Sequence, residues 1–126
     1  MGAPGAIGFG FPAFTRYRAG TSLGVMELTV TDNPARSRFE IYADGELAGF
    51  AVYQLDGGQM ALIHTETDDR FRGHGVASKL IRSSLDAARE RHLAVLPYCP
   101  FANSWISEHR EYVDLVPAAR RAGFNL

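Results

Sequence analysis

At residues 67–77 the sequence reads TDDRFRGHGVA, and the periodicity of the chain changes across this segment. Before it, apolar and polar residues alternate with the period of two that is typical of strands. After it, apolar residues recur every three or four positions, as in an amphipathic helix. The segment therefore predicts a junction between a strand and a helix, with Gly73 and Gly75 at the start of the helix.

Such a junction can bind phosphate groups through its main chain. The first N–H groups of a helix have no partner within the helix, and the helix dipole adds partial positive charge there. Gly73 and Gly75 allow a tight turn and a close approach to an anion, while Arg70, Arg72 and His74 add positive charge. The spacing fits neither a dinucleotide fingerprint nor a Walker loop. From spacing alone, a phosphate site and a plain turn with a basic flank are equally good interpretations.

Upstream of this segment, the alternation predicts four strands at residues 27–31, 37–42, 47–55 and 60–66. Short turn signals separate them, and the strongest is Asp44-Gly45, a typical hairpin turn. Four consecutive strands with short turns indicate an antiparallel meander. In the third strand, the alternation places Leu47 on the same face as Gly49 and Ala51.

Downstream of the segment, residues 76–91 form an amphipathic helix pattern. The apolar stripe of this helix consists of Val76, Leu80, Ile81, Leu85 and Ala88. Residues 93–96 are typical of a buried strand, which a right-handed crossover would place parallel to the fourth strand. Residues 101–109 predict a short helix, and residues 117–126 a basic, loose tail. The predicted fold class is α+β, or mixed α/β.

Composition limits the possible functions. The 126 residues fit one domain, spanning residues 26–116. A net charge of −1 argues against a nucleic-acid partner, and no apolar run reaches the roughly 18–20 residues that cross a membrane. Cys99 is the single cysteine, which excludes a disulfide within the chain and favours a reducing, cytoplasmic location. The four histidines and Cys99 have no metal-ligand spacing, so no metal is expected.

Residues 1–25 differ from the rest in composition. They are rich in Gly, Ala and Phe and lack the continuous apolar core of a secretory signal. We expect a flexible extension, an expression remnant or an over-called start, with Met26 as the true start. The alternative is a segment that docks on a surface through Phe9, Phe11 and Phe14.

Several segments together resemble a known family. Arg70-x-x-Gly73-x-Gly75 resembles the R/Q-x-x-G-x-G/A motif of the GNAT superfamily of N-acetyltransferases, and the order of elements is similar. Further segments resemble the small YjdJ-type N-acetyltransferase branch. They are Glu40-Ile41-Tyr42, Gly45–Phe50, His64-Thr65-Glu66, Pro97-Tyr98-Cys99-Pro100-Phe101 and His109–Val116. The resemblance covers residues 26–116 and implies a GNAT-like acyl-CoA N-acyltransferase fold.

The resemblance also implies a cosubstrate, acetyl-CoA, and residues that bind it. Its pyrophosphate would lie on the turn and helix start formed by Arg70, Phe71, Arg72, Gly73, His74, Gly75, Val76 and Ala77. Its pantetheine arm would lie between two separating strands, bound by main-chain groups that include Ile63 and Thr65. Asn103 would bind CoA or cap the short helix. This branch lacks helices that form the acceptor groove in larger members, so the resemblance does not define the acceptor site.

Transfer of an acetyl group to an amine requires a proton acceptor for the amine and benefits from a proton donor for the leaving thiolate. His64 and Glu66 are candidate proton acceptors. Cys99 is a candidate proton donor, or a nucleophile that carries the acetyl group itself. Each of these residues also has a structural interpretation. His64 could be a half-buried strand residue, and Glu66 could be a helix-entry acid or form a salt bridge to Arg72. Cys99 could be an inert core cysteine.

Three functions therefore remain open at this point. The first is an acetyl-CoA-dependent N-acetyltransferase that acts on an amine of a small molecule or a protein. The second is an acyl-CoA-binding module without catalysis, and the third is a protein-interaction domain. The sequence does not identify the amine or the oligomeric state, nor whether transfer is direct or passes through Cys99.

Overall fold

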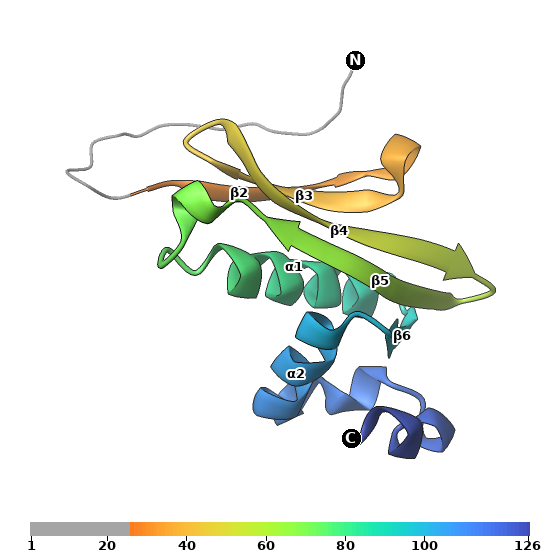
Figure 1. Cartoon of the computed structure of the whole chain (residues 1–126). Helices are drawn as coiled ribbons and strands as arrows, with labels where there is room; N and C mark the ends of the chain where they lie inside the picture. The colour runs from red at the N-terminus through yellow and green to blue at the C-terminus, as the bar shows by residue number, and fades with distance from the viewer. Residues whose placement is uncertain (1–25) are drawn as a thin grey trace.

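The two periodicities of the sequence correspond to a mixed sheet and two α-helices in the computed structural model, which describes residues 26–126 (Figure 1). Within these residues the sheet has the strand order β2-β3-β4-β5-β6. The strands are β2 (Leu28–Asn33), β3 (Arg38–Ala43), β4 (Glu46–Asp56), β5 (Gln59–Thr67) and β6 (Ala94–Pro97). The helices are α1 (Val76–Glu90) and α2 (Pro100–Glu108). Neither α-helix in this part of the chain is long and apolar enough to span a bilayer.

The predicted topology is confirmed. Strands β2 to β5 pair antiparallel in sequence order, and β6 pairs parallel to β5 after the crossover through α1. The hairpin between β3 and β4 turns at Asp44 and Gly45, which both have positive φ, as a two-residue turn of this kind requires. The observed strand and helix boundaries differ from the predicted ones by at most two residues.

A β-bulge corrects the predicted faces of β4. Ile41 pairs with Gly49, whereas Tyr42 pairs with Leu47, so Ala48 is an extra residue opposite this step. The extra residue reverses the alternation, and Ala48 is buried while Leu47 remains 39% exposed. The prediction that Leu47 shares a face with Gly49 and Ala51 is therefore wrong, because simple alternation does not allow for an inserted residue.

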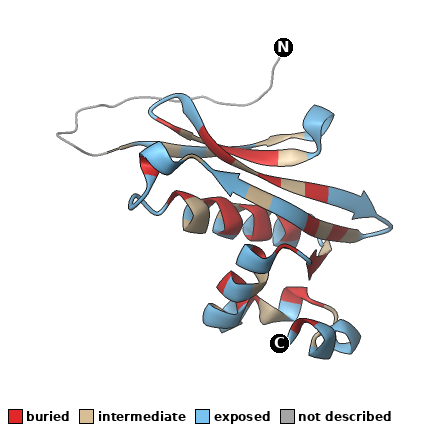
Figure 2. Cartoon of the chain, viewed as in Figure 1, coloured by how far each residue is buried: buried red, intermediate tan, exposed pale blue. Residues whose placement is uncertain are grey.

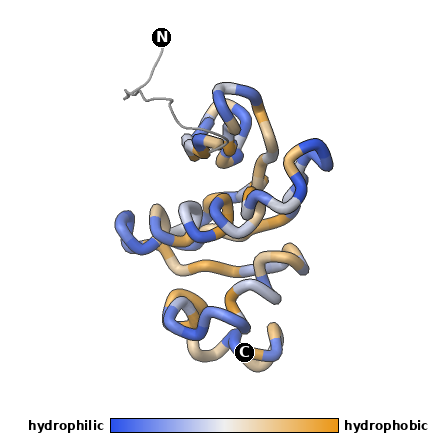
Figure 3. The backbone as a smooth tube through the Cα atoms, turned by 90° about the vertical axis from the view of Figure 1, so that its left-hand side faces the viewer, coloured by the Kyte–Doolittle hydropathy of each residue, from blue (hydrophilic) through white to orange (hydrophobic). Residues whose placement is uncertain are grey.

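The core lies between one face of the sheet and α1. All five residues of the predicted apolar stripe of α1 are buried (Figure 2). They pack against Phe39, Ile41, Ala51, Tyr53, Met60 and Leu62 of the sheet. Helix α2 lies beside α1, where Trp105 Nε1 donates a hydrogen bond of 2.8 Å to Ser78 Oγ. In Figure 3, the hydrophilic positions gather at the turns and on the outer side of the helices. No helix among residues 26–126 packs on the other face of the sheet (Figure 1).

The prediction of a loose tail after Pro117 is wrong. Residues 118–126 contain two short 3₁₀ turns, and Phe124 is buried. The ring of Phe124 packs edge-on against Tyr98 with centroids 5.3 Å apart, and Arg120 Nη2 donates to Tyr98 Oη at 2.8 Å. The ring of Phe124 and the hydrogen bond from Arg120 anchor this segment, although its basic composition suggested solvent exposure. The expectations for residues 1–25 lie outside the described residues.

We expect Gly49→Ala to destabilise the fold by about 1–3 kcal/mol, the usual cost of overpacking. A Cβ atom at residue 49 would lie 2.6 Å from the main-chain oxygen of Glu66 and 3.0 Å from Thr67 Cγ2, and β5 cannot move away without losing its pairing with β4. Urea unfolding measures the change. Gly123→Ala is the control, because a Cβ there meets no atom within 4 Å. Equal stability of the two variants would contradict the close approach of β4 and β5.

Candidate active site

The turn before α1 has the backbone that the glycine spacing predicts. Gly73 and Gly75 have φ values of 87° and 70°, a region that glycine adopts without strain. A Cβ atom at either position would meet no atom within 4 Å, so the conformation and not crowding by the protein requires glycine there. Phe71, which is buried, anchors the turn to the core. The outer side of the turn is therefore open to a ligand.

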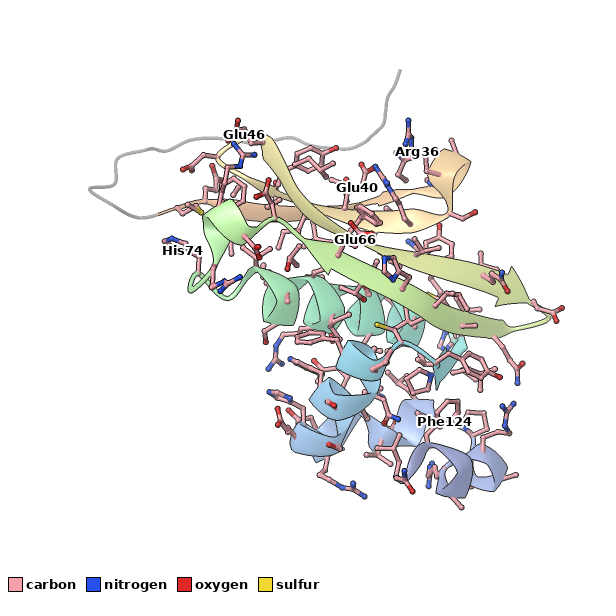
Figure 4. All side chains as sticks on the ribbon, viewed as in Figure 1. Arg36, Glu40, Glu46, Glu66, His74 and Phe124 are labelled. Carbon is pink, nitrogen blue, oxygen red and sulfur yellow. The ribbon has the colours of Figure 1, made fainter. Side chains whose placement is uncertain are left out.

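A pocket of about 240 Å³ lies at this turn and over the first residues of α1. It is lined by Thr67, Asp68, Asp69, Phe71, Arg72, Gly73, Gly75, Val76, Ala77 and Ser78. The first turn of α1 has no acidic residue and no side-chain cap, so its N–H groups are available to an acceptor from outside the helix. Of the residues predicted for this site, Arg70 and His74 do not line the pocket. His74 is exposed at the outer end of the turn (Figure 4).

The positive charge expected beside the turn is largely neutralised. Arg70 forms a salt bridge of 2.9 Å to Asp68, and Arg72 one of 2.8 Å to Asp69. The hydrogen bonds from Arg70 lower the pKa of the Asp68 carboxyl. The interpretation of Glu66 as a partner of Arg72 is wrong, since the neighbouring Asp69 is only three residues away and reaches it first. Two carboxylates thus line a pocket whose main-chain groups favour an anion.

The gap expected between the two parallel strands is present at β5 and the edge strand β6. The pairing of β5 with β6 ends at Leu62 and Pro97, and one further bond joins Cys99 N–H to the oxygen of Leu62 at 2.8 Å. Strand β5 continues to Thr67 without β6 beside it. At the start of the gap, Val52 pairs with His64 and Tyr53 pairs with Leu62, which leaves Ile63 as a bulged residue. The main chain of β5 can therefore bind a ligand along the gap.

Cys99 and Thr65 meet at the narrow end of this gap. The buried Cys99 thiol donates a hydrogen bond of 3.2 Å to Thr65 Oγ1. Cys99 is also the residue that precedes α2, and it makes no side-chain cap. The expectation that Asn103 could cap that helix is wrong, since Cys99 occupies the N-cap position. Because Pro100 occupies the first helical position, Asn103 lies one turn further in, with its N–H bonded to the oxygen of Cys99.

His64 and Glu66 form a pair on the opposite face of β5. His64 Nε2 and Glu66 Oε2 are 2.8 Å apart, and the two side chains are 55% and 60% exposed. His64 is thus a strand residue with a hydrogen-bond partner, as its structural alternative assumes, but it is more exposed than that alternative expects. Thr65 lies between them in sequence and points to the other face, toward Cys99. The structure thus joins His64 to Glu66 and Cys99 to Thr65, and places the two pairs on different faces of one strand.

A buried polar cluster that the sequence did not predict lies on the same face as His64 and Glu66. Its centre is Glu40, which is only 5% exposed. The carboxylate of Glu40 accepts hydrogen bonds from Arg38 Nε at 2.8 Å, Tyr42 Oη at 2.8 Å and Asn33 Nδ2 at 3.2 Å. The sequence contains a pattern that could have predicted this cluster. Polar residues occupy alternate positions of β3, on the face that does not pack against α1. No group of three or more His, Cys, Asp or Glu within residues 26–126 could hold a metal ion.

Comparisons with known proteins agree with this geometry. A family model described as GCN5-related N-acetyl-transferase matches residues 38–115. The structure is similar to the NMR structure of a GCN5-like protein from Staphylococcus aureus, with a TM-score of 0.56 and 24% identity over 71% of this chain and 87% of that chain. This likeness supports the fold.

Two further comparisons carry no functional argument. The crystal structure of Ard1 from Thermoplasma volcanium matches with a TM-score of 0.43 and 28% identity, over 47% of this chain and 41% of that chain. Among curated proteins, none matches this chain.

We expect Asp69→Asn to bind inorganic pyrophosphate about threefold more tightly than the wild type at low ionic strength. The substitution removes a negative charge from the pocket and frees Arg72 to contact the anion. Isothermal titration calorimetry measures the affinity, and the gain should shrink in high salt. Asp56→Asn, at the far end of β4, is the charge-matched control. Equal or weaker binding by Asp69→Asn would contradict the electrostatic role of this carboxylate.

We expect the stability difference between the wild type and Glu40→Gln to decrease as the pH falls from 6 to 3. Burial raises the pKa of Glu40, but its three hydrogen-bond donors outweigh burial and hold the pKa below the ordinary glutamate value. A carboxyl with a lowered pKa contributes stability above its unfolded pKa, near 4.3, and loses this contribution as the pH falls through its folded pKa. At neutral pH, Glu40→Gln should cost about 1.5–3 kcal/mol. Urea unfolding across this pH range measures the difference in the free energy of unfolding between the two proteins. A difference that does not change with pH would contradict the lowered pKa of Glu40.

Proposed function

Because the chain belongs to the family of GCN5-related N-acetyltransferases, we propose that it transfers the acetyl group of acetyl-CoA to the amine of an acceptor. The family match confirms the resemblance to the GNAT superfamily, whereas the narrower resemblance to the YjdJ-type branch stays a prediction, as does the cytoplasmic location. The observation that carries the proposal is the pocket over the start of α1, together with the gap between β5 and β6.

The residues present are suited to bind acetyl-CoA. The glycine turn and the uncapped first residues of α1 would bind the pyrophosphate through main-chain N–H groups. The main chain of Ile63 and Thr65 would bind the pantetheine arm along the gap, as backbone groups commonly do where a strand loses its neighbour. Asn103 lies on α2 one turn beyond Cys99 and is a further candidate contact. These assignments rest on the open side of the turn and on the end of the β5–β6 pairing.

Acetyl-CoA supplies an activated thioester, whose carbonyl carbon forms a bond to the amine nitrogen while its bond to sulfur breaks and that electron pair leaves on sulfur. In our proposal, His64 accepts the proton of the amine, and Glu66 orients the imidazole through the 2.8 Å hydrogen bond. Cys99 holds a proton on Sγ at the end of the gap and would donate it to the leaving sulfur. The Cys99 thiol is buried and hydrogen-bonded to Thr65, and a thiol in such a position is a poor nucleophile. We therefore propose direct transfer of the acetyl group and not transfer through an acetylated Cys99.

We expect Gly73→Asp to abolish CoA binding while the protein stays folded. Aspartate tolerates a positive φ better than most residues, but its charge would face the pyrophosphate. Gly58→Asp is a matched control, because Gly58 has nearly the same φ, 86° against 87°, and a Cβ atom at either glycine meets open space. Calorimetry gives the affinity for CoA, and thermal unfolding reports the fold. CoA binding by Gly73→Asp with wild-type affinity would refute the placement of the pyrophosphate.

The same assay extended to turnover tests catalysis. We expect Glu66→Gln to lower kcat/KM by about 10²-fold at unchanged CoA affinity, as for loss of a group that assists proton transfer. Glu108→Gln, an exposed residue at the end of α2, is the control. Release of CoA thiol with a panel of amines gives the rates, and intact-mass measurement detects an acetyl adduct on Cys99. If the protein binds CoA but turns over no amine, the alternative of an acyl-CoA-binding module without catalysis is favoured. If an acetyl adduct is present in the wild type and absent in Cys99→Ala, transfer passes through Cys99 and is not direct.

A further inference from the structure

The face of the sheet opposite α1 carries two aligned rows of side chains. The strand register forms one row of Arg38, Val52 and His64 and a second row of Glu40, Phe50 and Glu66. We call these six residues the open-face site. In each row, an apolar residue of β4 separates a charged residue of β3 from a polar residue of β5. Figure 4 labels Glu40 and Glu66 on this part of the sheet.

Arg38 is held in a fixed position at one end of this site. Its Nε donates to Glu40 at 2.8 Å, and its guanidinium carbon lies 4.3 Å from the centroid of the Phe50 ring. The side chain is only 16% exposed. Among residues 26–126, the two terminal nitrogens of Arg38 form no hydrogen bond. A guanidinium with these two nitrogens available has the geometry to bind a carboxylate through two parallel hydrogen bonds.

The opposite end of the site attracts an amine. The His64 ring lies 6.4 Å from the Phe50 ring, and Glu66 is the register partner of Phe50 on β5. Glu66 is well exposed, and its hydrogen bond with His64 uses only Oε2, so Oε1 can accept a hydrogen bond from an ammonium group. At the other end, Glu40 balances the charge of Arg38. Net charge therefore favours an amine at β5, whereas a carboxylate at β3 would be bound by the two terminal N–H groups of Arg38 and not by net positive charge.

The position of Glu40 gives this arrangement its rigidity. Three donors satisfy its buried carboxylate, and they include Asn33 from the neighbouring strand β2. None of these groups faces α1, so the cluster adds nothing to the apolar core and is costly to bury. Its effect is to hold the Arg38 guanidinium over Phe50. Glu40 is therefore a positioning residue for Arg38.

We propose that the acceptor is an amino-carboxylic acid that lies over Phe50 and Val52, with its carboxylate on Arg38 and its amine beside His64 and Glu66. The inference rests on the proposed acetyl transfer and assigns its acceptor class. The amine would then lie within reach of the imidazole that accepts its proton, on the face of β5 opposite Cys99.

Matched pairs of amines test the proposal with the full chain. The pairs are glycine, 3-aminopropanoate, 4-aminobutanoate and 5-aminopentanoate, each against its carboxamide, in a CoA-release assay. In at least one pair, we expect kcat/KM for the carboxylate to exceed that for the amide by about tenfold or more, because a carboxylate gains charge-assisted hydrogen bonds that an amide does not. Turnover of amines without any preference for a carboxylate would overturn the acceptor class and leave acetyl transfer intact. Failure to bind CoA would overturn both.

Variants of Arg38 give an independent test. We expect Arg38→Gln to reduce the carboxylate-to-amide ratio about tenfold, mainly through KM. Since Arg38→Gln leaves Glu40 without its cationic partner, Arg38→Lys is the second variant: it keeps the charge beside Glu40 but loses the planar pair of donors, and it should also reduce the ratio. Arg36→Gln, exposed in the turn between β2 and β3, is the matched control (Figure 4). An unchanged ratio in folded Arg38→Lys and Arg38→Gln would refute the role of Arg38.

NMR on the full chain identifies what occupies the open-face site. In the presence of CoA and the best carboxylate, we expect nuclear Overhauser contacts from the Phe50 ring to the acceptor. Contacts from Phe50 to residues 1–25 or to a second copy of the chain, undisplaced by the acceptor, would assign the face to those occupants and overturn the proposal.

Discussion

A parallel pair of strands that stops pairing halfway leaves main-chain donors and acceptors without partners, and in this chain that happens beyond Leu62 and Pro97. Two prolines account for the position of the break. Pro97 has no N–H to continue a ladder, and Pro100 occupies the first position of α2, so the chain turns away from β5 within three residues. The bond from Cys99 N–H to the oxygen of Leu62 fixes the point of separation. The gap and the position of Cys99 follow from this turn.

The turn before α1 combines opposing electrostatic features. Its uncapped N–H groups and the dipole of a fifteen-residue helix favour an anion, whereas Asp68 and Asp69 oppose one. The salt bridges of these two residues restrain Arg70 and Arg72, so the free turn carries little net charge. A binding site that relies on main-chain groups keeps its geometry when these exposed side chains move. If Arg70 and Arg72 left Asp68 and Asp69 to contact an anion, the affinity would change but the backbone of the turn would not. Binding of the proposed pyrophosphate by the main chain would account for the two glycines, and the salt bridges account for the modest charge of the region.

The sequence predicted the elements of this fold well because each depends on local periodicity. Alternation in β2 to β5, the apolar stripe of α1 and the turn at Asp44-Gly45 are visible within short windows. The bulges at Ala48 and Ile63 were not predicted, because an inserted residue changes which face later side chains occupy without changing the composition of the strand. Anchoring of the last residues by Phe124 depends on contact with Tyr98, which lies 26 positions earlier. In the candidate site, the turn was predictable, whereas the partners of Arg70, Arg72 and Glu66 depend on three-dimensional neighbours.

Alternation along β5 explains how one strand presents two separate pairs of side chains. Alternate residues of a regular strand face opposite sides, so Thr65 and its neighbours His64 and Glu66 are necessarily separated by the thickness of the sheet. In larger acetyltransferases of the resembled superfamily, additional helices build the acceptor groove, and residues 26–126 contain none on this face. A sheet surface without such a cover binds a small molecule at a lower entropic cost when its own side chains are already fixed. The cluster around Glu40 provides that rigidity, because a buried carboxylate with three donors holds Arg38 in place as a packed helix would.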